Sequence, residues 1–266
     1  MTSLAAHGVR GAQFMQQHGF AYRFDWGMEG LRSLAPTVDV VIVVDVLRFS
    51  SAVCAAVEGG SVVLPYPWAS GDAASFALAR SAELAGRRED GVPSLSPTDL
   101  LTLTPGTRLV LPSPNGAALA FAARDLGASR VFAGCLRNAS AVAGAARSAI
   151  GDGGSLAVIA AGERWDDASG PLRPAVEDLL GAGAILAALD PSSAVANPRC
   201  SPEAGAARVA FLAARPRLFE ALSESGSGRD LIERGWEDDV ATCAALDVTT
   251  AVPELIGDEF VHTRQS

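Results

Sequence analysis

Residues 38–58 hold the side chains whose types and spacing point most directly to chemistry. An unbroken apolar run ends at Asp45, and Arg48 and the hydroxyls of Ser50 and Ser51 follow before a helical pattern begins. The first turn of a helix has free backbone N–H groups and the positive end of the helix dipole, so it attracts phosphate-like anions. The segment therefore predicts a carboxylate and a guanidinium beside an anion-binding helix start.

Similar layouts follow three other predicted strands. In open α/β sheets, ligands bind beyond the carboxyl ends of the strands. If the strands are parallel neighbours, we expect the polar groups at these ends to meet at one edge of the sheet. The residues at these ends are Ser113, Asn115 and Gly116, then Gly134, Arg137 and Asn138, and finally Gly162, Glu163 and Arg164.

Each of these residues also has an explanation that needs no site. Asp45 could be only a turn former, Asn115-Gly116 a turn with a helix cap, and Arg137-Asn138 a helix N-cap with a solvated arginine. Arg164 could be a surface charge. Several acids open predicted helices, where the dipole favours them whatever the function; these are Glu177, Asp178, Asp238 and Asp239. The acid–arginine pair favours a site at Asp45.

The polar residues that remain suit a hard divalent cation. The three histidines, His7, His18 and His262, all lie near the ends of the sequence, so a histidine-based triad or metal site is not expected. Carboxylates and substrate oxygens are ligands that Mg²⁺ prefers. All 21 basic residues are arginines, so a lysine-containing phosphate loop is excluded, and no G-x-G-x-x-G follows the first predicted strand.

Composition limits the partners and the compartment. The net charge of −9 disfavours nucleic-acid binding, and no apolar run is long enough for a membrane span. The four cysteines are far apart, which excludes a zinc cluster and fits a cytoplasmic protein. A small anionic ligand is therefore the expected partner. The alanine-rich helices could also pack between subunits, so a homo-oligomer is left open.

Apolar runs alternate with alanine-rich helical patterns along the chain. This alternation predicts an α/β fold: three α/β/α layers with a largely parallel, mixed central sheet and a helical C-terminal section. We expect one domain over residues 1–266, divided at most into two packed lobes over about 38–165 and 166–266, with a loose arm over 1–20. Strands are predicted at 40–44, 61–64, 108–111, 130–133 and 156–160, and helices at 51–58, 73–85, 116–126, 140–150, 175–189, 203–214 and 236–246. Loops are predicted at 87–107 and 190–202.

The ordered motifs resemble those of the 2-phosphosulfolactate phosphatase family. That family shows V-I-D-V-L-R-A-[ST]-[ST], and residues 43–51 here read V-V-D-V-L-R-F-S-S. Its T-N-G-T is similar to Pro114-Asn115-Gly116-Ala117, and its L-N-A-S-A-V-A to residues 136–143, with one arginine inserted. Its A-G, L-E-D, G-A and D-[VI]-x-x-C…V-P segments resemble residues at 161–162, 176–178, 183–184, 239–243 and 252–253.

The resemblance implies an α/β/α fold, Mg²⁺ dependence, hydrolysis of 2-phospho-3-sulfolactate to sulfolactate and phosphate, and a place near coenzyme M biosynthesis. On this basis Asp45 would ligate Mg²⁺, with Glu177 or Asp239 as further ligands. Arg48 and Arg164 would act with Asp45 as catalytic residues by holding the phosphate or sulfonate. The expected substrate-binding set is Ser50, Asn115, Gly116, Arg137, Asn138 and Gly162.

The chain departs from the family pattern at two segments. The usual G-E-R-G and G-N-S-P read Gly86-Arg87-Arg88-Glu89 and Ser94-Leu95-Ser96-Pro97, and the threonines around Asn115-Gly116 are absent. These changes leave two alternatives open. One is a non-catalytic anion- or metabolite-binding protein on the same fold, and the other is a phosphatase with a shifted substrate, such as a phosphosugar.

Overall fold

The strands of the computed structural model form one mixed sheet and a separate two-stranded ribbon. The structure describes residues 14–67, 72–165, 170–191 and 197–263. Within them, nine strands pair in the order β1-β7-β2-β6-β10-β11-β3-β5-β4, and β8 pairs with β9. Their bounds are β1 Tyr22–Trp26, β2 Val40–Val44, β3 Val62–Pro67, β4 Glu83–Leu84, β5 Arg108–Ser113, β6 Arg130–Gly134, β7 Leu156–Ala160, β8 Glu163–Arg164, β9 Leu172–Arg173, β10 Pro253–Ile256 and β11 Glu259–His262.

The β10–β11 hairpin lies between two groups of parallel strands. β1, β7, β2 and β6 are parallel neighbours, and so are β3, β5 and β4. The three pairings β6–β10, β10–β11 and β11–β3 are antiparallel. The second group therefore runs against the first, so β5 and β2 are not the parallel neighbours that the sequence led us to expect.

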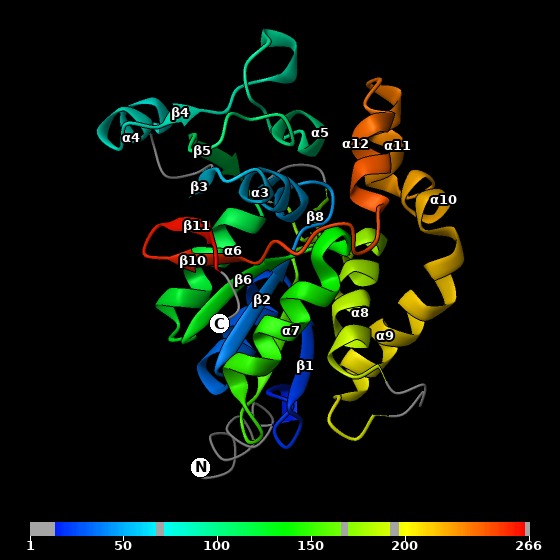
Figure 1. Cartoon of the computed structure of the whole chain (residues 1–266). Helices are drawn as coiled ribbons and strands as arrows, with labels where there is room; N and C mark the ends of the chain where they lie inside the picture. Colours follow the sequence, from blue (N-terminus) through cyan, green and yellow to red (C-terminus); the bar gives the residue numbers. More distant parts are fainter. Residues whose placement is uncertain (1–13, 68–71, 166–169, 192–196, 264–266) are drawn as a thin grey trace, which may run out of the picture.

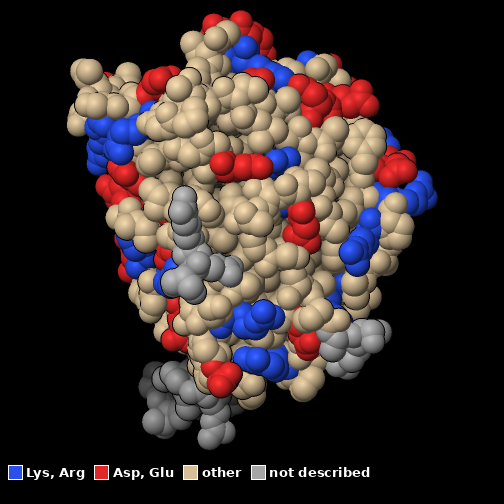
Figure 2. All heavy atoms as spheres, in the orientation of Figure 1, with Lys and Arg blue, Asp and Glu red and all other residues tan. Residues whose placement is uncertain are grey.

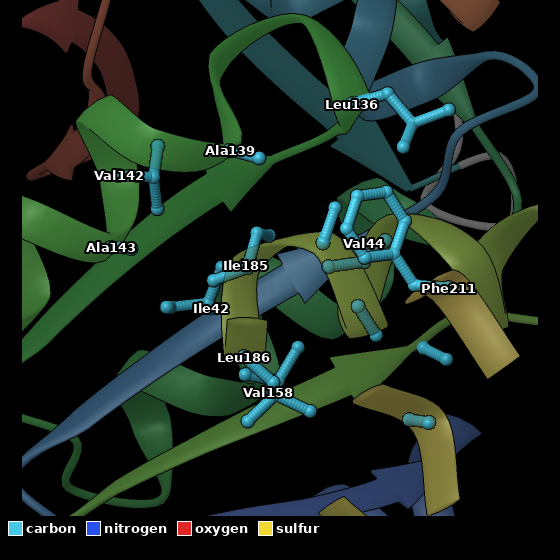
Figure 3. Close-up of a cluster of buried hydrophobic side chains, with 14 of the residues drawn as sticks. Ile42, Val44, Leu136, Ala139, Val142, Ala143, Val158, Ile185, Leu186 and Phe211 are labelled. Carbon is cyan, nitrogen blue, oxygen red and sulfur yellow. The ribbon is translucent and has the colours of Figure 1, made fainter. Parts of the chain in front are cut away.

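Helices cover both faces of the sheet (Figure 1). Alternate residues of β2 point to opposite faces, as the pleat requires. Ile42 and Val44 pack with α7, α8 and α9, whereas Val41 and Val43 pack with α2, α3 and α6. Figure 3 shows the first of these clusters, where Ile42 and Val158 face Ile185 and Leu186 of α8. The helices around the sheet are α2 Gly27–Leu34, α3 Phe49–Glu58, α4 Ala73–Ala79, α5 Pro97–Leu100, α6 Gly116–Asp125, α7 Ala139–Ile150, α8 Val176–Leu189 and α9 Pro202–Ala214.

The C-terminal part of the chain is helical before it returns to the sheet. α10 Leu218–Ser223, α11 Gly226–Glu233 and α12 Glu237–Ala244 follow α9 along one side of the molecule (Figure 1). The predicted three-layer α/β/α fold, with a largely parallel mixed sheet and a helical C-terminal section, is confirmed. Most of the N-terminal arm expected over residues 1–20, and residues 192–196 of the second predicted loop, lie outside the described residues.

The segment predicted as a loop over 87–107 contains local structure. Short helical turns lie at Arg88–Asp90 and Pro97–Leu100. Ser96 caps α5 by accepting a hydrogen bond from Asp99 N, and the side chains of Ser96 and Leu100 are fully buried. This segment is therefore packed against the protein, and α5 contacts both α3 and α12.

Charges of both signs are mixed on the surface. On the face shown in Figure 2, arginine and acidic side chains lie in small neighbouring groups. In the described part of the chain, no helix combines the length and apolar character needed to cross a bilayer. All four cysteines are buried free thiols.

Candidate active site

The turn from β2 to α3 fixes the Asp45 carboxylate. One oxygen accepts a hydrogen bond from Phe49 N at 3.1 Å, and the other accepts from Gly116 N at 3.2 Å. Ser50 is buried in the same turn, where its hydroxyl accepts from Asp45 N and donates to the Val43 carbonyl. The start of α6 therefore meets the Asp45 turn, as predicted, although β5 runs against β2. Ser50 shapes this turn, and its contacts give no support to a direct role in substrate binding.

Gly116 has to be glycine for this approach to occur. A Cβ atom at this position would lie 2.1 Å from Phe49 Cδ1 and 3.0 Å from the Asp45 Oδ2 atom. Real Cβ contacts are not this short, because packed interiors leave no such overlap. The close contact between the α3 and α6 starts thus depends on the missing side chain.

Three further acids surround Asp45. Asp178 joins two loops, because its carboxylate accepts from Val46 N at 2.7 Å and from Gly162 N at 2.8 Å. Glu177 is buried beside it, and its Oε2 atom has no hydrogen-bond partner. The fourth acid, Glu163, accepts a long hydrogen bond of 3.5 Å from Asn115 Nδ2. We call Asp45, Glu163, Glu177 and Asp178 the acid cluster.

Three carboxyl groups of the acid cluster, those of Asp45, Asp178 and Glu163, hold their protons more tightly than separate carboxylates would. Burial and repulsion from Glu163 raise the pKa of Asp45 from 3.8 to about 7, although the N–H groups of Phe49 and Gly116 act in the opposite direction. Burial, followed by repulsion from Asp45 and Glu177, raises the pKa of Asp178 well above its ordinary value. Burial and repulsion from Glu177 also raise the pKa of Glu163. A cation placed among these oxygens would be strongly favoured.

A cleft of about 340 Å³ opens beside the acid cluster. Glu163 belongs to both, and Asp230 is the other acid in the cleft wall. The described lining also includes Leu47, Leu95, Leu231, Gly226, Ser227, Trp236 and the arginines Arg48, Arg173 and Arg234. Arginine binds phosphate and sulfonate through several N–H donors in a fixed plane. The cleft thus brings three arginines next to Glu163, the acid that it shares with the acid cluster.

Arg48 is held from two sides. Its Nη1 atom donates to Asp239 Oδ2 at 2.6 Å, and its guanidinium lies 4.8 Å from the ring centre of Trp236. Asp239 is fully buried, and its other oxygen accepts from Ser96 Oγ at 2.5 Å. Arg88 Nη1 also lies 3.6 Å from Asp239 Oδ2. Two guanidinium groups therefore already balance the Asp239 charge, whereas the partners of Asp45 are two neutral backbone N–H groups. These contacts favour Asp45 over Asp239 as a ligand for a further cation.

Two residues that were predicted to bind substrate, Asn138 and Arg137, instead contact backbone groups and an acidic side chain of the protein. The Asn138 amide accepts from Cys135 N and donates to the carbonyls of Ala133 and Ala251. Arg137 is buried against Glu58, at 3.0 Å, and against the Thr242 carbonyl. Neither residue is among the described lining of the cleft. β2 and β6 are parallel neighbours in register up to Val44 and Gly134, so the turns after them lie side by side, but the side chains of Arg137 and Asn138 contact structural partners. Their role in substrate binding stays a prediction.

The remaining predicted residues lie close to the cluster in different ways. Gly162 donates its N–H to Asp178, and a Cβ atom there would lie 2.7 Å from Leu172 Cδ1. Arg164 lies on β8, next to Glu163, and its Nη1 atom donates a hydrogen bond to the Gly170 carbonyl at 3.4 Å. β9 pairs with β8 and places Arg173 in the cleft. Arg164 is not among the described lining of the cleft, whereas Arg173 is, and the anion-binding role predicted for Arg164 stays a prediction.

The acid cluster suits Mg²⁺ better than a metal ion that takes all of its ligands from the protein. Within the described residues, no group of three or more His, Cys, Asp or Glu side chains is arranged to hold a metal ion. Mg²⁺ commonly uses one or two carboxylates and takes its other ligands from water and substrate phosphate. Asp45 and the unpartnered Glu177 Oε2 atom fit such a two-carboxylate site.

Comparison with known proteins assigns the chain to a family. The family model described as 2-phosphosulpholactate phosphatase matches residues 30–258. The chain belongs to this family. It is similar to the "Probable 2-phosphosulfolactate phosphatase" of Thermus thermophilus, with 31% identity over 236 residues, 85% of this chain and 93% of the relative. It is also 31% identical to the "2-phosphosulfolactate phosphatase" of Methanothermobacter thermautotrophicus over 216 residues, 80% of this chain and 84% of the relative. The family predicted from the ordered motifs is confirmed.

Several residues of the candidate active site could not be assigned to it from the sequence alone. Asp178 appeared only as an acid at a helix start and in the segment that resembles L-E-D, without a role of its own, and Glu163 appeared only as a strand-end residue. Arg173 and Arg234 gave no signal, because they belong to no motif and reach the cleft through the β8–β9 ribbon and α11–α12. Trp236 was placed at a helix start, where nothing in the sequence pairs it with Arg48.

Proposed function

We propose that this chain is a Mg²⁺-dependent phosphatase that hydrolyses 2-phosphosulfolactate or a related small anionic phosphoester. The observation that carries the proposal is the meeting of the acid cluster with an arginine-lined cleft. Family membership supports the phosphatase class, and both relatives are named for 2-phosphosulfolactate. The products would be the free alcohol, here sulfolactate, and inorganic phosphate.

The cleft has separate places for more than one anionic group. Arg48 lies next to the β2–α3 turn that carries Asp45, so we assign it to the phosphoryl group. Arg173 donates to Ser227 Oγ at 3.3 Å at the start of α11, and Arg234 pairs with Asp230 at 3.0 Å. We assign Arg173 and Arg234 to the second anion, a sulfonate or carboxylate. Separate cations orient a small substrate that has charges at both ends.

Asp45 and Glu177 would hold Mg²⁺, and Glu163 would contribute through its charge or through water. When bound, the ion would neutralise negative charge on the phosphoryl oxygens and make a nearby water more acidic. The chain itself keeps Asp45 in place through the N–H groups of Phe49 and Gly116. Asp178 keeps the turn at Val46 and the turn at Gly162 together, so it acts on the site through the backbone.

Two routes for the phosphoryl group are compatible with this arrangement. In one, a carboxylate of the cluster takes a proton from water as the water oxygen attacks phosphorus. In the other, an Asp45 oxygen attacks phosphorus, the ester oxygen leaves, and water then hydrolyses the phosphoaspartate. Brief reaction with ³²P-labelled substrate, followed by acid quenching, distinguishes them, because only the second route leaves label on the protein.

We also propose a cytoplasmic enzyme of sulfonate metabolism. The four free thiols support a reducing compartment. The sulfonate setting, including a link to coenzyme M biosynthesis, rests on the names of the relatives and stays a proposal, as does self-association into a homo-oligomer.

The test is phosphate release from 2-phosphosulfolactate with Mg²⁺ and with EDTA. We expect release that requires Mg²⁺ and falls by at least about a thousandfold in Asp45→Asn, because the cluster loses a charge that no other group replaces. Asp152→Asn is the matched control, since Asp152 is exposed and lies on the turn before β7. Full activity of Asp45→Asn would remove Asp45 from the mechanism. Binding of the substrate without any release would instead identify an anion-binding protein.

A further inference from the structure

A second cavity adjoins the candidate active site and has a different chemical character. It has a volume of about 500 Å³, which lies within the range of small-molecule pockets. Its apolar walls come from the ends of three neighbouring strands, from the start of α4 and from Leu95. The residues used below are Tyr66, Leu84, Ala85, Leu95, Leu111 and Pro112. We call this space the apolar cavity.

The apolar cavity borders the site at two elements. Leu95 lines the apolar cavity and also the arginine-lined cleft. β5 contributes Leu111 and Pro112 to the cavity wall, and the chain then continues to Asn115, which contacts Glu163, and Gly116, which contacts Asp45. A ligand whose phosphate lies at Asp45 would therefore have the apolar cavity beside it.

The charges at the apolar cavity do not suit a second anion. Its ionised lining residues are Arg87 and Asp90, and these pair with each other through two hydrogen bonds of 3.2 Å. With one arginine and one acid, the described lining of the apolar cavity has no net charge, whereas the described lining of the cleft has three arginines and two acids. An anion is therefore favoured in the cleft over the apolar cavity. Apolar groups gain most from walls of this kind, because they leave water without losing hydrogen bonds.

We infer that the apolar cavity binds an uncharged, apolar substituent of the substrate. The ligand class is a phosphomonoester that carries a short alkyl or aryl group in addition to its anionic end. This inference rests on the proposed phosphatase function and extends it to substrate choice. The reaction is unchanged: water adds to phosphorus, the P–O ester bond breaks, and the alcohol leaves with a proton.

The test measures binding and turnover separately. Isothermal titration with Mg²⁺ and a series of n-alkylphosphonates, from methyl to hexyl, reports binding without hydrolysis. Each added CH₂ that enters the cavity should lower Kd about three- to fourfold, until the chain fills the space. Phosphate release from the matching n-alkyl phosphates should show the same increments in kcat/KM.

Filling the apolar cavity should remove these increments. Ala85→Phe places a ring in the cavity and should leave the Kd of methylphosphonate within about twofold of its wild-type value while removing the gain with chain length. Ala73→Phe fills the cavity from the α4 side and serves as a second variant if Ala85→Phe does not fold. Ala79→Phe is the matched control, because Ala79 is exposed on α4 and is not among the described lining of the cavity.

The outcomes separate the two proposals. Wild-type affinity that stays flat or falls with chain length overturns the apolar cavity as a substrate site, whether or not the protein is a phosphatase. Increments that persist in both filled variants also overturn it, because the alkyl chain would then bind elsewhere. Absence of phosphate release from every ester, with the binding increments intact, overturns the phosphatase function and leaves the ligand class standing.

Discussion

The stability of the metal-free protein should fall as pH rises, and Asp45 should cause part of that fall. Burial and the Glu163 charge raise the pKa of Asp45 from 3.8 to about 7. The folded protein therefore keeps a proton that the unfolded chain releases at lower pH. Stability is greatest below the unfolded value and is lost as pH rises through the folded value. Between pH 5 and pH 8, Asp45 should remove about 2–3 kcal/mol.

The assay is urea unfolding of EDTA-treated wild type and Asp45→Asn at pH 5 and pH 8. The asparagine has one acceptor oxygen, so either Phe49 N or Gly116 N loses its partner, at a cost of about 1–3 kcal/mol at every pH. The informative quantity is the difference between the two proteins, which should shift by about 2–3 kcal/mol in favour of the variant at pH 8. Asp152→Asn should follow the wild-type profile.

Mg²⁺ provides a second arm of the same experiment. Because the ion needs ionised carboxylates, it should raise the unfolding midpoint of the wild type more at pH 8 than at pH 5.5. The variant should show a much smaller response. If wild type and Asp45→Asn have parallel pH profiles without metal, Asp45 is ionised in the folded protein and the reasoning about the acid cluster is refuted.

Three further predictions concern single contacts. Asp239→Asn releases Arg48, so kcat/KM should fall about a hundredfold. Addition of 1 M NaCl should lower kcat/KM less in this variant than in the wild type. An unchanged kcat/KM would contradict the role of Asp239. Gly116→Ala should lower the unfolding free energy by about 1–3 kcal/mol in urea and also abolish Mg²⁺-dependent release, since its Cβ meets Phe49 and Asp45. Asn138→Ala should cost about 3 kcal/mol in the same unfolding assay but keep kcat/KM within about twofold, and selective loss of activity would restore Asn138 to the site.

The strands that the sequence predicted best are those buried on both faces. Residues 40–44 and 156–160 are continuous apolar runs, and the structure places β2 and β7 over the same residues. β1 and the β10–β11 hairpin were missed because their sequences mix charged and apolar residues in short segments. The helix predicted over 73–85 ends at Ala79, where Ser81 adopts a positive φ of 51° and the chain turns into β4.

The site was predictable where its residues are close in sequence or follow a strand. Asp45 and Arg48 met both conditions, and Gly116 met the second because it follows β5. The Arg48–Asp239 pair joins residues separated by 191 positions, so only the folded chain could show that Asp239 holds an arginine. Arg137 and Asn138 followed a strand as well. The Asn138 side chain bonds nearby backbone groups, and Arg137 pairs with the distant Glu58 and Thr242, which residue type alone does not reveal.

The position of the β10–β11 hairpin has a consequence for biosynthesis. Residues 253–262 fill the middle of the sheet and join β6 to β3, yet the ribosome makes them after every other strand. Until they emerge, the nascent chain holds two unconnected half-sheets, each with an open edge that can pair with another chain. A stalled or prematurely terminated polypeptide would therefore be prone to aggregate, and holdase chaperones should be needed mainly in that interval.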